Sequence, residues 1–471
     1  MIEIRHLVPE SLSAYREAIG EAFAHFQRRT AASARGVDPR GTASDSAFGR
    51  LIRLALESPT LHKLAQVLAR HRSLPLDLRL ELQTLESFAP RRPMDETLAI
   101  IREDLGDGLN ELELETAALA EASVAVVVPF LWRSHGGDSS RGVLKVLKPG
   151  ASERLERELA VWSDVGEVFG DRCRRDGLPD VDYREPFDTV ANLLRHEIDF
   201  AAEQRHLALA AATLTGVHGV RVPRLLPFCT PRVTAMERLD GVKVTNTDTL
   251  TASARRCLAG RVVEALLAQP MFSAEPEAMF HADPHAGNLV ATDSGELAVL
   301  DWALVGFLTA ADREQLSQMV LSAQLLDVNG VCLAVERLSK MARPDAMSLR
   351  AVVERSLAQS RNALGPSFSW LIELLDAAAM KCGLRFSENL LLFRKTLLIL
   401  RGVVEDIISE GALDGLLMSS AMNQLSQEWP ARLFLPAGSR RFGSRLSTLD
   451  LLRAGCLLPL TAASRWLQSV P

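Results

Sequence analysis

Apolar residues recur at intervals of three and four along most of this chain, which is the spacing of one face of a helix. Near the N-terminus this stripe consists of Leu12, Tyr15, Ile19, Phe23 and Phe26. The same spacing predicts helices over 1–35, 58–68, 94–105 (capped at Asp95) and 187–214. From about residue 250 onward nearly every segment has this pattern, so the C-terminal half is expected to be mainly helical.

Short apolar runs of a different kind lie among these helices. Residues 122–130 and 141–148 flank a turn that contains Gly and Ser, and they predict a β-hairpin. Residues 219–226 and 232–237 predict two further strands. Lys145 has apolar neighbours on both sides in the second hairpin strand, so its pattern is compatible with solvent exposure and with ligand binding alike.

One polar stretch interrupts the helical C-terminal half. Asp283 is followed five residues later by Asn288, and Asp301 comes after a hairpin-sized gap. Short apolar segments at 289–290 and 297–300 predict buried strands that anchor these polar loops. Mg²⁺ prefers hard oxygen ligands and takes only one or two from the protein. The stretch therefore predicts a site for Mg²⁺ and phosphate groups.

Composition narrows the class of protein. The chain has 471 residues, more than one hydrophobic core usually supports, so two or three domains are expected. Its net charge of -6 argues against bulk nucleic-acid binding. The six cysteines are scattered, which argues against a zinc site and favours a reducing compartment. Arg394-Lys395 and Arg453 interrupt the most apolar segments, so no transmembrane helix is expected.

The candidate residues occur in the order that protein kinases use: a strand lysine, a helix acid, a hinge, Asp-x4-Asn and a second Asp. In that order Lys145 would hold the α- and β-phosphates of ATP and be oriented by a helix carboxylate. Asp283 would accept a proton from the nucleophile or position it. Asn288 and Asp301 would bind Mg²⁺.

Four segments also carry family motifs. They are Lys63–Gln66 for a KxGQ motif, Ala118–Ala125 for an Ala-rich loop, Glu197–Asp199 for an ExD motif and Phe280–Leu289 for FHADPHPGNL. On these segments, and on the hinge-like Met236–Val242, the chain resembles the UbiB family (AarF, ADCK) of atypical protein-kinase-like proteins, which is tied to isoprenoid quinone biosynthesis. The resemblance covers about residues 45–410, and its most specific part is the catalytic stretch.

The resemblance implies an α+β fold: a protein-kinase-like bilobal fold with an N-terminal helical extension and a mostly helical C-lobe. It makes Glu203 the ion-pair partner of Lys145. In the family the extension covers the site where ordinary kinases bind a protein substrate, so ATP hydrolysis or small-molecule phosphorylation is the implied activity.

The resemblance also assigns two further groups of residues. The regulatory lid would bring Glu197 and Asp199 to Lys63, with Gln66 beside it. The nucleotide would lie against Ala122, Ser123, Met236 and Glu237, and the implied cofactors are ATP and Mg²⁺.

Several positions depart from the family pattern. Ala65 replaces the Gly of KxGQ, Val126 replaces a Gln, and Ala286 replaces a Pro. Trp302-Ala303 stands where kinases have Phe-Gly, and we expect the loss of that Gly to restrict the backbone. None of these changes removes a charged catalytic group, so ATP and Mg²⁺ binding is expected to be retained.

The expected domains are an extension over 1–110, an N-lobe over 111–240, a C-lobe over 241–430 and a tail over 431–471. The tail either packs on the helical lobe or lies on a membrane surface. The expected partners are a small-molecule or lipid substrate and quinone-biosynthesis proteins, without nucleic acid. The expected location is the cytoplasm, with peripheral contact at the inner membrane face left open.

Alternative interpretations remain for several features. A small-molecule phosphotransferase of the aminoglycoside or homoserine-kinase type would also use this loop with Asp301-Trp302, and a pseudokinase scaffold would bind nucleotide without turnover. His281 and His285 are interpreted as loop-stabilising residues and not as metal ligands, because Pro284 argues against a helix there. A third set, Arg172, Arg174 and Arg175, is interpreted as part of a solvated loop.

Overall fold

The structure is a computed structural model that describes most of the chain between residues 4 and 469. The residues left undescribed are 1–3, 6–7, 9, 32–53, 56–57, 69–81, 83–93, 123, 134–138, 179–183, 247–248, 341–344, 360–367, 410 and 470–471. The chain forms two compact units. The first unit comprises Met1–Leu209, Pro223–Leu239 and Asp301–Leu304, and the second comprises Ala210–Val222, Asp240–Leu300 and Val305–Pro471.

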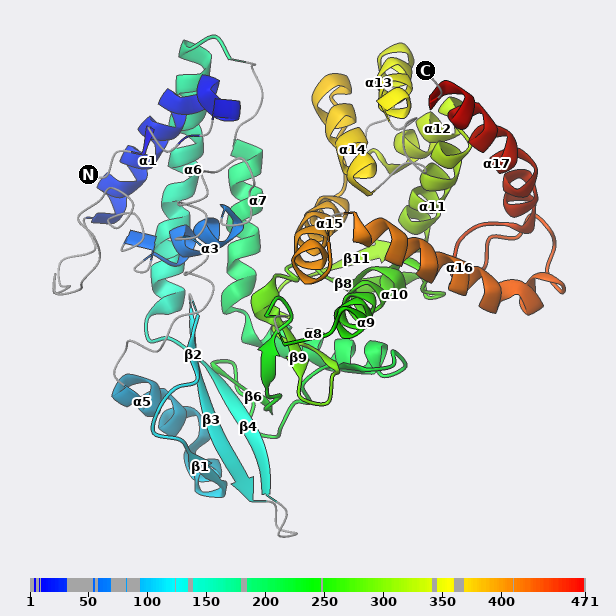
Figure 1. The fold of residues 1–471 in the computed structure, drawn as a ribbon. Coiled ribbons are helices and arrows are strands. Elements are labelled where there is room, and N and C mark those ends of the chain that lie inside the picture. The colour runs from blue at the N-terminus through cyan, green and yellow to red at the C-terminus, as the bar shows by residue number, and fades with distance from the viewer. Residues whose placement is uncertain are drawn as a thin grey trace. The chain divides into compact units, whose positions relative to one another are not determined.

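The first unit contains an antiparallel sheet in the order β1-β3-β4-β6, with β2 added on β3. Its strands are β1 (Leu112–Leu114), β2 (Ala120–Glu121), β3 (Ala125–Arg133), β4 (Ser139–Leu147) and β6 (Val233–Glu237). Helix α5 (Met94–Leu105) lies along one face of this sheet (Figure 1). Its residues Ile100 and Ile101 share a buried core with Leu144 and Val146 of β4. The predicted hairpin is therefore present, as β3 and β4.

Strand alternation determines where Lys145 points. Leu144 and Val146 face the core beneath α5, so the intervening Lys145 faces the other side of the sheet. On that side lies the start of α8 (Phe200–Leu214), whose Phe200 packs against Leu147. An aliphatic strand thus holds a lysine side chain against the first turns of a helix.

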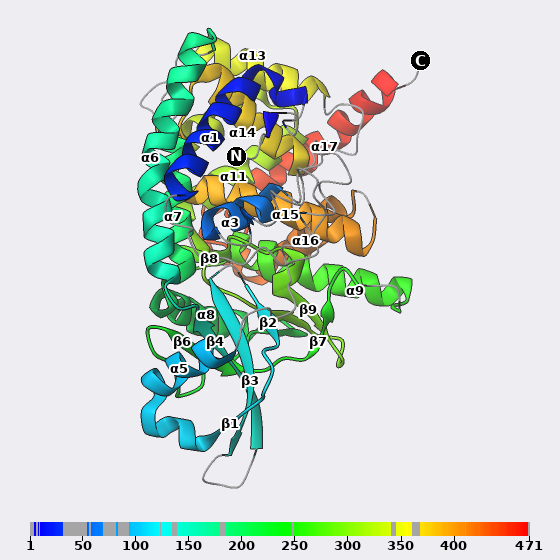
Figure 2. The same ribbon diagram turned by 90° about the vertical axis from the view of Figure 1, so that its left-hand side faces the viewer.

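The rest of the first unit is a helical group around α6 (Ala151–Arg175). Three other helices lie against α6: α1 (Arg16–Ala31), α3 (Pro59–Leu68) and α7 (Arg184–Arg195) (Figure 1, Figure 2). Trp162 of α6, Phe26 of α1 and Leu194 of α7 belong to one buried cluster, against which Leu61 of α3 packs. The helical stripe predicted near the N-terminus therefore forms part of a real core.

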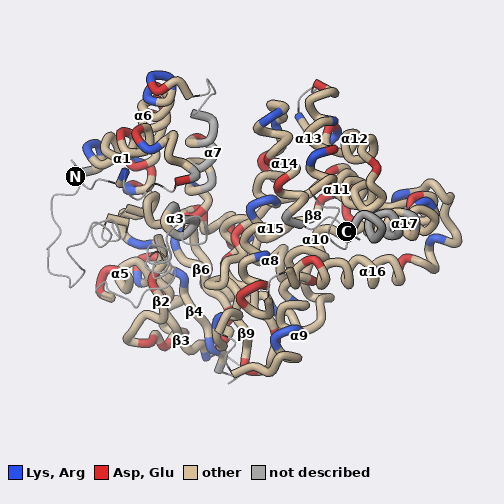
Figure 3. Tube along the Cα trace, turned by 45° about the horizontal axis from the view of Figure 1, so that its top comes forward, with Lys and Arg blue, Asp and Glu red and all other residues tan. Residues whose placement is uncertain are grey.

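The interpretation of Arg172, Arg174 and Arg175 as a solvated loop was wrong, because all three lie in the last turn of α6. Both acidic and basic residues occur along α1 and α6 (Figure 3). Arg172 pairs with Asp176, the residue that follows α6, and with Glu21 of α1. The helix was overlooked because charged residues dilute its apolar stripe, although cations at a helix C-terminus are themselves favourable.

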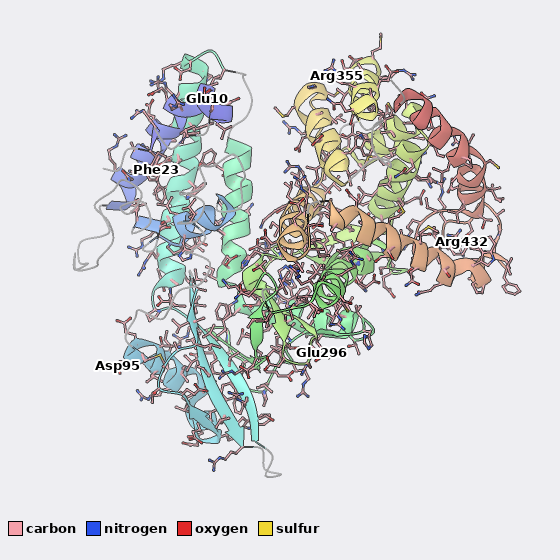
Figure 4. The ribbon with its side chains drawn as sticks, in the orientation of Figure 1. Glu10, Phe23, Asp95, Glu296, Arg355 and Arg432 are labelled. Atoms are coloured by element: carbon pink, nitrogen blue, oxygen red, sulfur yellow. The ribbon has the colours of Figure 1, made fainter. Side chains whose placement is uncertain are left out.

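Two other helix predictions need correction. The segment predicted as one helix over 187–214 is α7, a 3-10 turn at His196–Ile198 and then α8, because Asp199 leaves the helical conformation and caps α8. Asp95 does not cap α5. It lies within the first turn of that helix (Figure 4), where its charge still favours the helix N-terminus.

The second unit contains two small sheets. The first has the order β5-β10-β9-β7, formed by β5 (Val220–Arg221), β7 (Gly241–Lys243), β9 (Leu289–Thr292) and β10 (Leu297–Val299). The second pairs β8 (Glu277–His281) with β11 (Val305–Thr309). The strands predicted at 289–290 and 297–300 are present, β8 and β11 were not foreseen, and only two residues of 219–226 are in a strand.

Helices make up the remainder of the second unit, as predicted. They are α9 (Ala252–Val263), a π-helical turn (Glu264–Ala268), α10 (Gln269–Met271), α11 (Ala310–Gln324), α12 (Val328–Leu338), α13 (Ala346–Gln359), α14 (Phe368–Cys382), α15 (Glu388–Ile407), α16 (Ala412–Arg432) and α17 (Thr448–Ser469). Among the helices that the structure describes, none is both long and apolar enough to span a membrane.

The C-terminal tail packs on the helices of the second unit. Arg432 lies at the end of α16 (Figure 4), where it is buried, pairs with Glu428 and donates to the Leu446 carbonyl. Asp450 of α17 accepts a hydrogen bond from Gln318 of α11. Of the two interpretations of the tail, these contacts support packing on the helical lobe.

A close backbone approach at Gly306 gives a test of this packing. A Cβ at Gly306 would lie 2.2 Å from Cζ of Phe280, a ring that is itself packed against Phe393. We expect Gly306→Ala to lower the free energy of unfolding by roughly 1–3 kcal/mol, because the buried ring has no room to move. Gly402→Ala on α15 meets nothing within 4 Å and should be neutral or stabilising. Urea unfolding of both variants checks this, and equal midpoints would contradict it.

Candidate active site

A buried lysine with two carboxylate partners lies in the first unit. Lys145 Nζ is 2.6 Å from Glu203 Oε1 of α8 and 3.2 Å from Asp301 Oδ2. The side chains of Lys145 and Glu203 are 9% and 2% exposed, whereas that of Asp301 is 37% exposed. The predicted ion pair between Lys145 and Glu203 is therefore present, and Asp301 joins it from the solvent side.

Opposing effects set the ionisation of this cluster. Burial disfavours the charged form of Lys145, but the carboxylates of Asp301, Glu203 and Glu197 outweigh it and raise the lysine pKa. Burial also raises the pKa of Glu203 to about 7, assisted by the negative charge of Asp301 and opposed by Lys145. The other oxygen of Glu203, Oε2, is buried and accepts no hydrogen bond from the residues that the structure describes. Among the described residues, Lys145 is thus the cation that balances the buried Glu203 carboxylate.

Asp301 has a left-handed backbone conformation, with φ of 49°. Asp tolerates this region better than most residues. Its Oδ1 accepts a hydrogen bond from the Ala303 backbone N–H. Ala303 does not have a positive φ, so the expected backbone restriction from the lost Gly does not arise at that position. Trp302 is buried, and its carbonyl contacts His206 Nδ1, which fixes the segment against α8.

The segment with Glu197 and Asp199 joins α7 to α8. Asp199 Oδ1 accepts a hydrogen bond from the Ala202 backbone N–H and so caps the helix that carries Glu203. Ile198 packs against two buried clusters, that of the α6 helical group and that formed by Val124, Leu147 and Phe200. This segment therefore connects the helical group to the end of the strand that bears Lys145.

Helix α3, which bears the KxGQ-like motif, is attached to α6 by a buried carboxylate. Glu158 Oε2 accepts hydrogen bonds from Ser58 Oγ, Thr60 N and Thr60 Oγ1. Burial raises the pKa of Glu158, and these hydrogen bonds oppose that shift. Leu61 of α3 packs on the same cluster as Ile198. Sequence reasoning missed Glu158, which looks like an ordinary acid of a charged helix.

Several predicted residues fall outside what the structure describes. The side chains of Lys63 and Gln66 are not described, although their helix is, and Ser123 is not described at all. The expected meeting of Lys63 with Glu197 or Asp199 is therefore untested. Of the predicted nucleotide contacts, Ala122 is exposed and its carbonyl accepts from Lys148 Nζ.

The predicted hinge residues Met236 and Glu237 end strand β6, opposite Val143 and Gly142 of β4. The Glu237 carboxylate pairs with Arg224. The hinge acid therefore has a local structural partner.

The loop after β8 carries Asp283 in the second unit. His281 Nδ1 accepts from the Asp283 backbone N–H, so its Nε2 carries the hydrogen and donates to the Leu300 carbonyl. His285 Nδ1 accepts from the Gly287 backbone N–H, and Asn288 Nδ2 donates to the Asp283 carbonyl. The interpretation of both histidines as loop-stabilising residues is confirmed. These hydrogen bonds fix the loop backbone at Asp283, and among the described residues they leave the amide oxygen of Asn288 unused.

Lys395 is a partner of Asp283 that sequence reasoning missed. Its Nζ lies 3.0 Å from Asp283 Oδ1, and the pair is mostly buried, at 25% and 9% exposure. From the sequence alone, Lys395 is only a charge that interrupts an apolar segment. A lysine within the run Leu390–Leu400 is the feature that could have drawn attention to it.

The oxygen donors fit a hard cation. Asp301 offers a partly exposed carboxylate, and Asn288 offers an amide oxygen because its nitrogen is already used by the Asp283 carbonyl. Carboxylate and amide oxygens are the ligands that suit Mg²⁺. Asp301 and Asn288 belong to different compact units, so each is considered separately as a candidate Mg²⁺ ligand.

A family model described as the ABC1 atypical kinase-like domain matches residues 84–334, more than half of the chain. The chain belongs to this family.

Similar curated proteins agree with that membership. A "Probable protein kinase UbiB" of Pseudomonas fluorescens is 27% identical over 382 residues, covering 75% of this chain and 67% of that protein. The protein of the same name from Pseudomonas entomophila is 27% identical over 379 residues, with the same coverage. The resemblance stated from the motifs is therefore confirmed.

A solved structure supports the fold. The Rv3197–erythromycin complex from Mycobacterium tuberculosis has a TM-score of 0.53 and 17% sequence identity, covering 84% of this chain and 90% of that one. At that identity the likeness shows the fold alone. With the family model, it confirms the predicted α+β kinase-like fold.

The Lys145 ion pair predicts a strong response to mutation. Lys145→Met should lower the free energy of unfolding by roughly 3–5 kcal/mol, because it leaves the Glu203 carboxylate buried without a cation. The double variant with Glu203→Leu removes both charges and should recover most of that loss. Urea unfolding of wild type and both variants measures the effect. A double variant as unstable as Lys145→Met would contradict the assignment.

The Glu158 contacts predict a local effect on α3. Glu158→Ala leaves the hydroxyls of Ser58 and Thr60 without their acceptor, at a cost of roughly 1–3 kcal/mol. Amide hydrogen exchange should therefore quicken across Pro59–Leu68. Glu156→Ala is the matched control, since Glu156 lies on the same helix in an exposed pair with Arg195 and contributes little. Equal exchange in the two variants would refute the anchoring role.

Proposed function

We propose that this chain is a UbiB-type atypical kinase or ATPase that binds ATP with Mg²⁺. The observation that supports it best is the buried Lys145–Glu203 pair with Asp301 beside it. A lysine that is buried and fully charged needs a reason beyond stability, because an apolar pair of the same volume would serve the fold at least as well. Binding of nucleotide phosphates supplies that reason.

In this proposal the residues of the first unit bind the nucleotide. Lys145 contacts the α- and β-phosphates and is held in position by Glu203. Ala122 and Ser123 line the phosphates, and the backbone at Met236 and Glu237 contacts the adenine. Helix α3 serves as the lid that carries Lys63 and Gln66, with Glu197 and Asp199 as its counterpart. The support for the lid is that α3 and Ile198 pack on one core cluster.

Asp283 and Asn288 of the second unit and Asp301 of the first are assigned to the chemistry. Asp283 accepts the proton of the attacking hydroxyl or water, or orients it. Asn288 and Asp301 would each supply an oxygen ligand to Mg²⁺, which would neutralise charge on the phosphates. The joint action of the two groups is inferred from family membership and from their order along the chain.

The substrate belongs to quinone or related lipid metabolism in this proposal. Its support is the UbiB name of the curated relatives. Quinone-biosynthesis proteins are the proposed partners, in the cytoplasm or at the inner membrane face. Peripheral membrane contact would involve the exposed apolar side chains at the end of α16, which are Trp429, Leu433 and Phe434.

Small-molecule phosphotransfer of the aminoglycoside type is less favoured, because α3 and the Glu197–Asp199 segment share a core.

Nucleotide binding tests the proposal directly. Mg²⁺ and ATP at a hundred times Kd should stabilise the wild type by about 2.7 kcal/mol, a rise of several degrees in Tm. Asp301→Asn should reduce the Mg²⁺-dependent part of this shift. Asp293→Asn, in the exposed turn between β9 and β10, is the matched control and should keep it. No shift with any nucleotide would refute the proposal.

Turnover separates an enzyme from a nucleotide-binding scaffold. Asp283→Asn should keep the thermal shift but lower ATP turnover by about 10²–10⁴, the usual contribution of a general base. Phosphate release measures it. A wild type that binds nucleotide without turnover would leave the scaffold as the correct function.

A further inference from the structure

Helix α15 is fixed against the segment that carries Asp283. The ring of Phe393 packs edge-on against Phe280, with centroids 5.3 Å apart. Thr396 Oγ1 donates to the His281 carbonyl at 3.1 Å, and Thr396 is fully buried. These contacts come from successive turns of one helix face.

A third contact fixes the start of α15. Asn389 Oδ1 accepts a hydrogen bond from the backbone N–H of Phe307, the residue that pairs with Met279 across β8 and β11. Asn389, Phe393 and Thr396 thus attach the helix to both strands of the small sheet. A side chain between these anchors is held on a rigid element, as a preorganised catalytic group requires.

Lys395 is that side chain. It follows Arg394 and precedes Thr396, and its ammonium reaches Asp283 Oδ1 at 3.0 Å. The other oxygen, Oδ2, lies 3.9 Å from His285 Nε2. Among the described residues, Lys395 is therefore the lysine at this carboxylate, whereas His285 is charged only when protonated. The residues assigned to phosphate or metal binding do not include Lys395.

We propose that Lys395 is a positioning residue for Asp283 and holds its carboxylate in the orientation that turnover requires. The inference rests on the proposed function, in which Asp283 acts on the attacking group. A carboxylate with one oxygen held by an ammonium is restricted in its rotation. Without the ammonium the side chain can rotate, and a misplacement of about 1 Å can cost 10²-fold in rate.

The neighbouring arginine supplies a matched control. Arg394 lies on the same helix and is similarly half-buried, but it pairs with Asp376 of α14. Removal of Arg394 breaks an ion pair of α15 without touching the Asp283 loop. The comparison therefore separates loss of any α15 ion pair from loss of the one at Asp283.

The experiment compares Lys395→Met, Lys395→Arg and Arg394→Met in the full chain, by ATP turnover and by the thermal shift with Mg²⁺ and ATP. We expect Lys395→Met to lower kcat by about 10²-fold, with an unchanged KM for ATP and an unchanged thermal shift. Lys395→Arg should recover most of kcat, because it restores the cation. Arg394→Met should leave kcat and KM at wild-type values.

Each other outcome has a defined meaning. If Lys395→Met keeps or exceeds the wild-type kcat, the positioning role is wrong while the proposed function stands. A loss shared equally by Arg394→Met, or one that Lys395→Arg does not restore, assigns Lys395 to helix stability and also overturns the inference. If the wild type shows no thermal shift with nucleotide, the proposed function itself fails.

Discussion

A buried ammonium is the constraint on which the first unit depends. Lys145 cannot be charged in an apolar interior without carboxylates close to it, because an unpaired buried ion costs several kcal/mol. Its partners come from distant parts of the chain: Glu203 from α8 and Asp301 from the segment after β10. The sheet, the helix and the returning segment must therefore all be in place before the lysine is stabilised. The same requirement fixes the positions of the three charged groups relative to one another.

Helix caps and hydrogen bonds between neighbouring residues hold these groups in place. Asp199 caps the helix that presents Glu203, and Ile198 beside it packs into two cores at once. Asp301 adopts a left-handed conformation that its own carboxylate stabilises through the Ala303 N–H. In the second unit, hydrogen bonds of His281 and Asn288 fix the Asp283 backbone. Chemical groups thus sit on loops whose conformations are set by neighbouring residues.

The sequence predicted what depends on local pattern. The β3–β4 hairpin follows from two apolar runs that flank a turn with Gly and Ser, and the strands after Asn288 follow from short apolar runs between polar loops. The helix α6 escaped prediction because many charged residues dilute its buried stripe of Leu155, Leu159 and Trp162. The contacts of Lys395 and Glu158 could not be predicted for a different reason. Their partners, Asp283 and Thr60, lie about a hundred residues away, and no spacing along the chain records such a contact.

The two contacts of Lys145 differ in a way that suits a binding site. Glu203 is buried, so its ion pair with Lys145 is shielded from solvent. Asp301 is partly exposed, and its contact with Lys145 is longer. In the proposed function a Mg²⁺ ion takes Asp301 as a ligand while Glu203 retains the lysine, and the ammonium then faces a phosphate. The partly exposed Asp301 is therefore the member of the cluster that a cation from solvent would meet first.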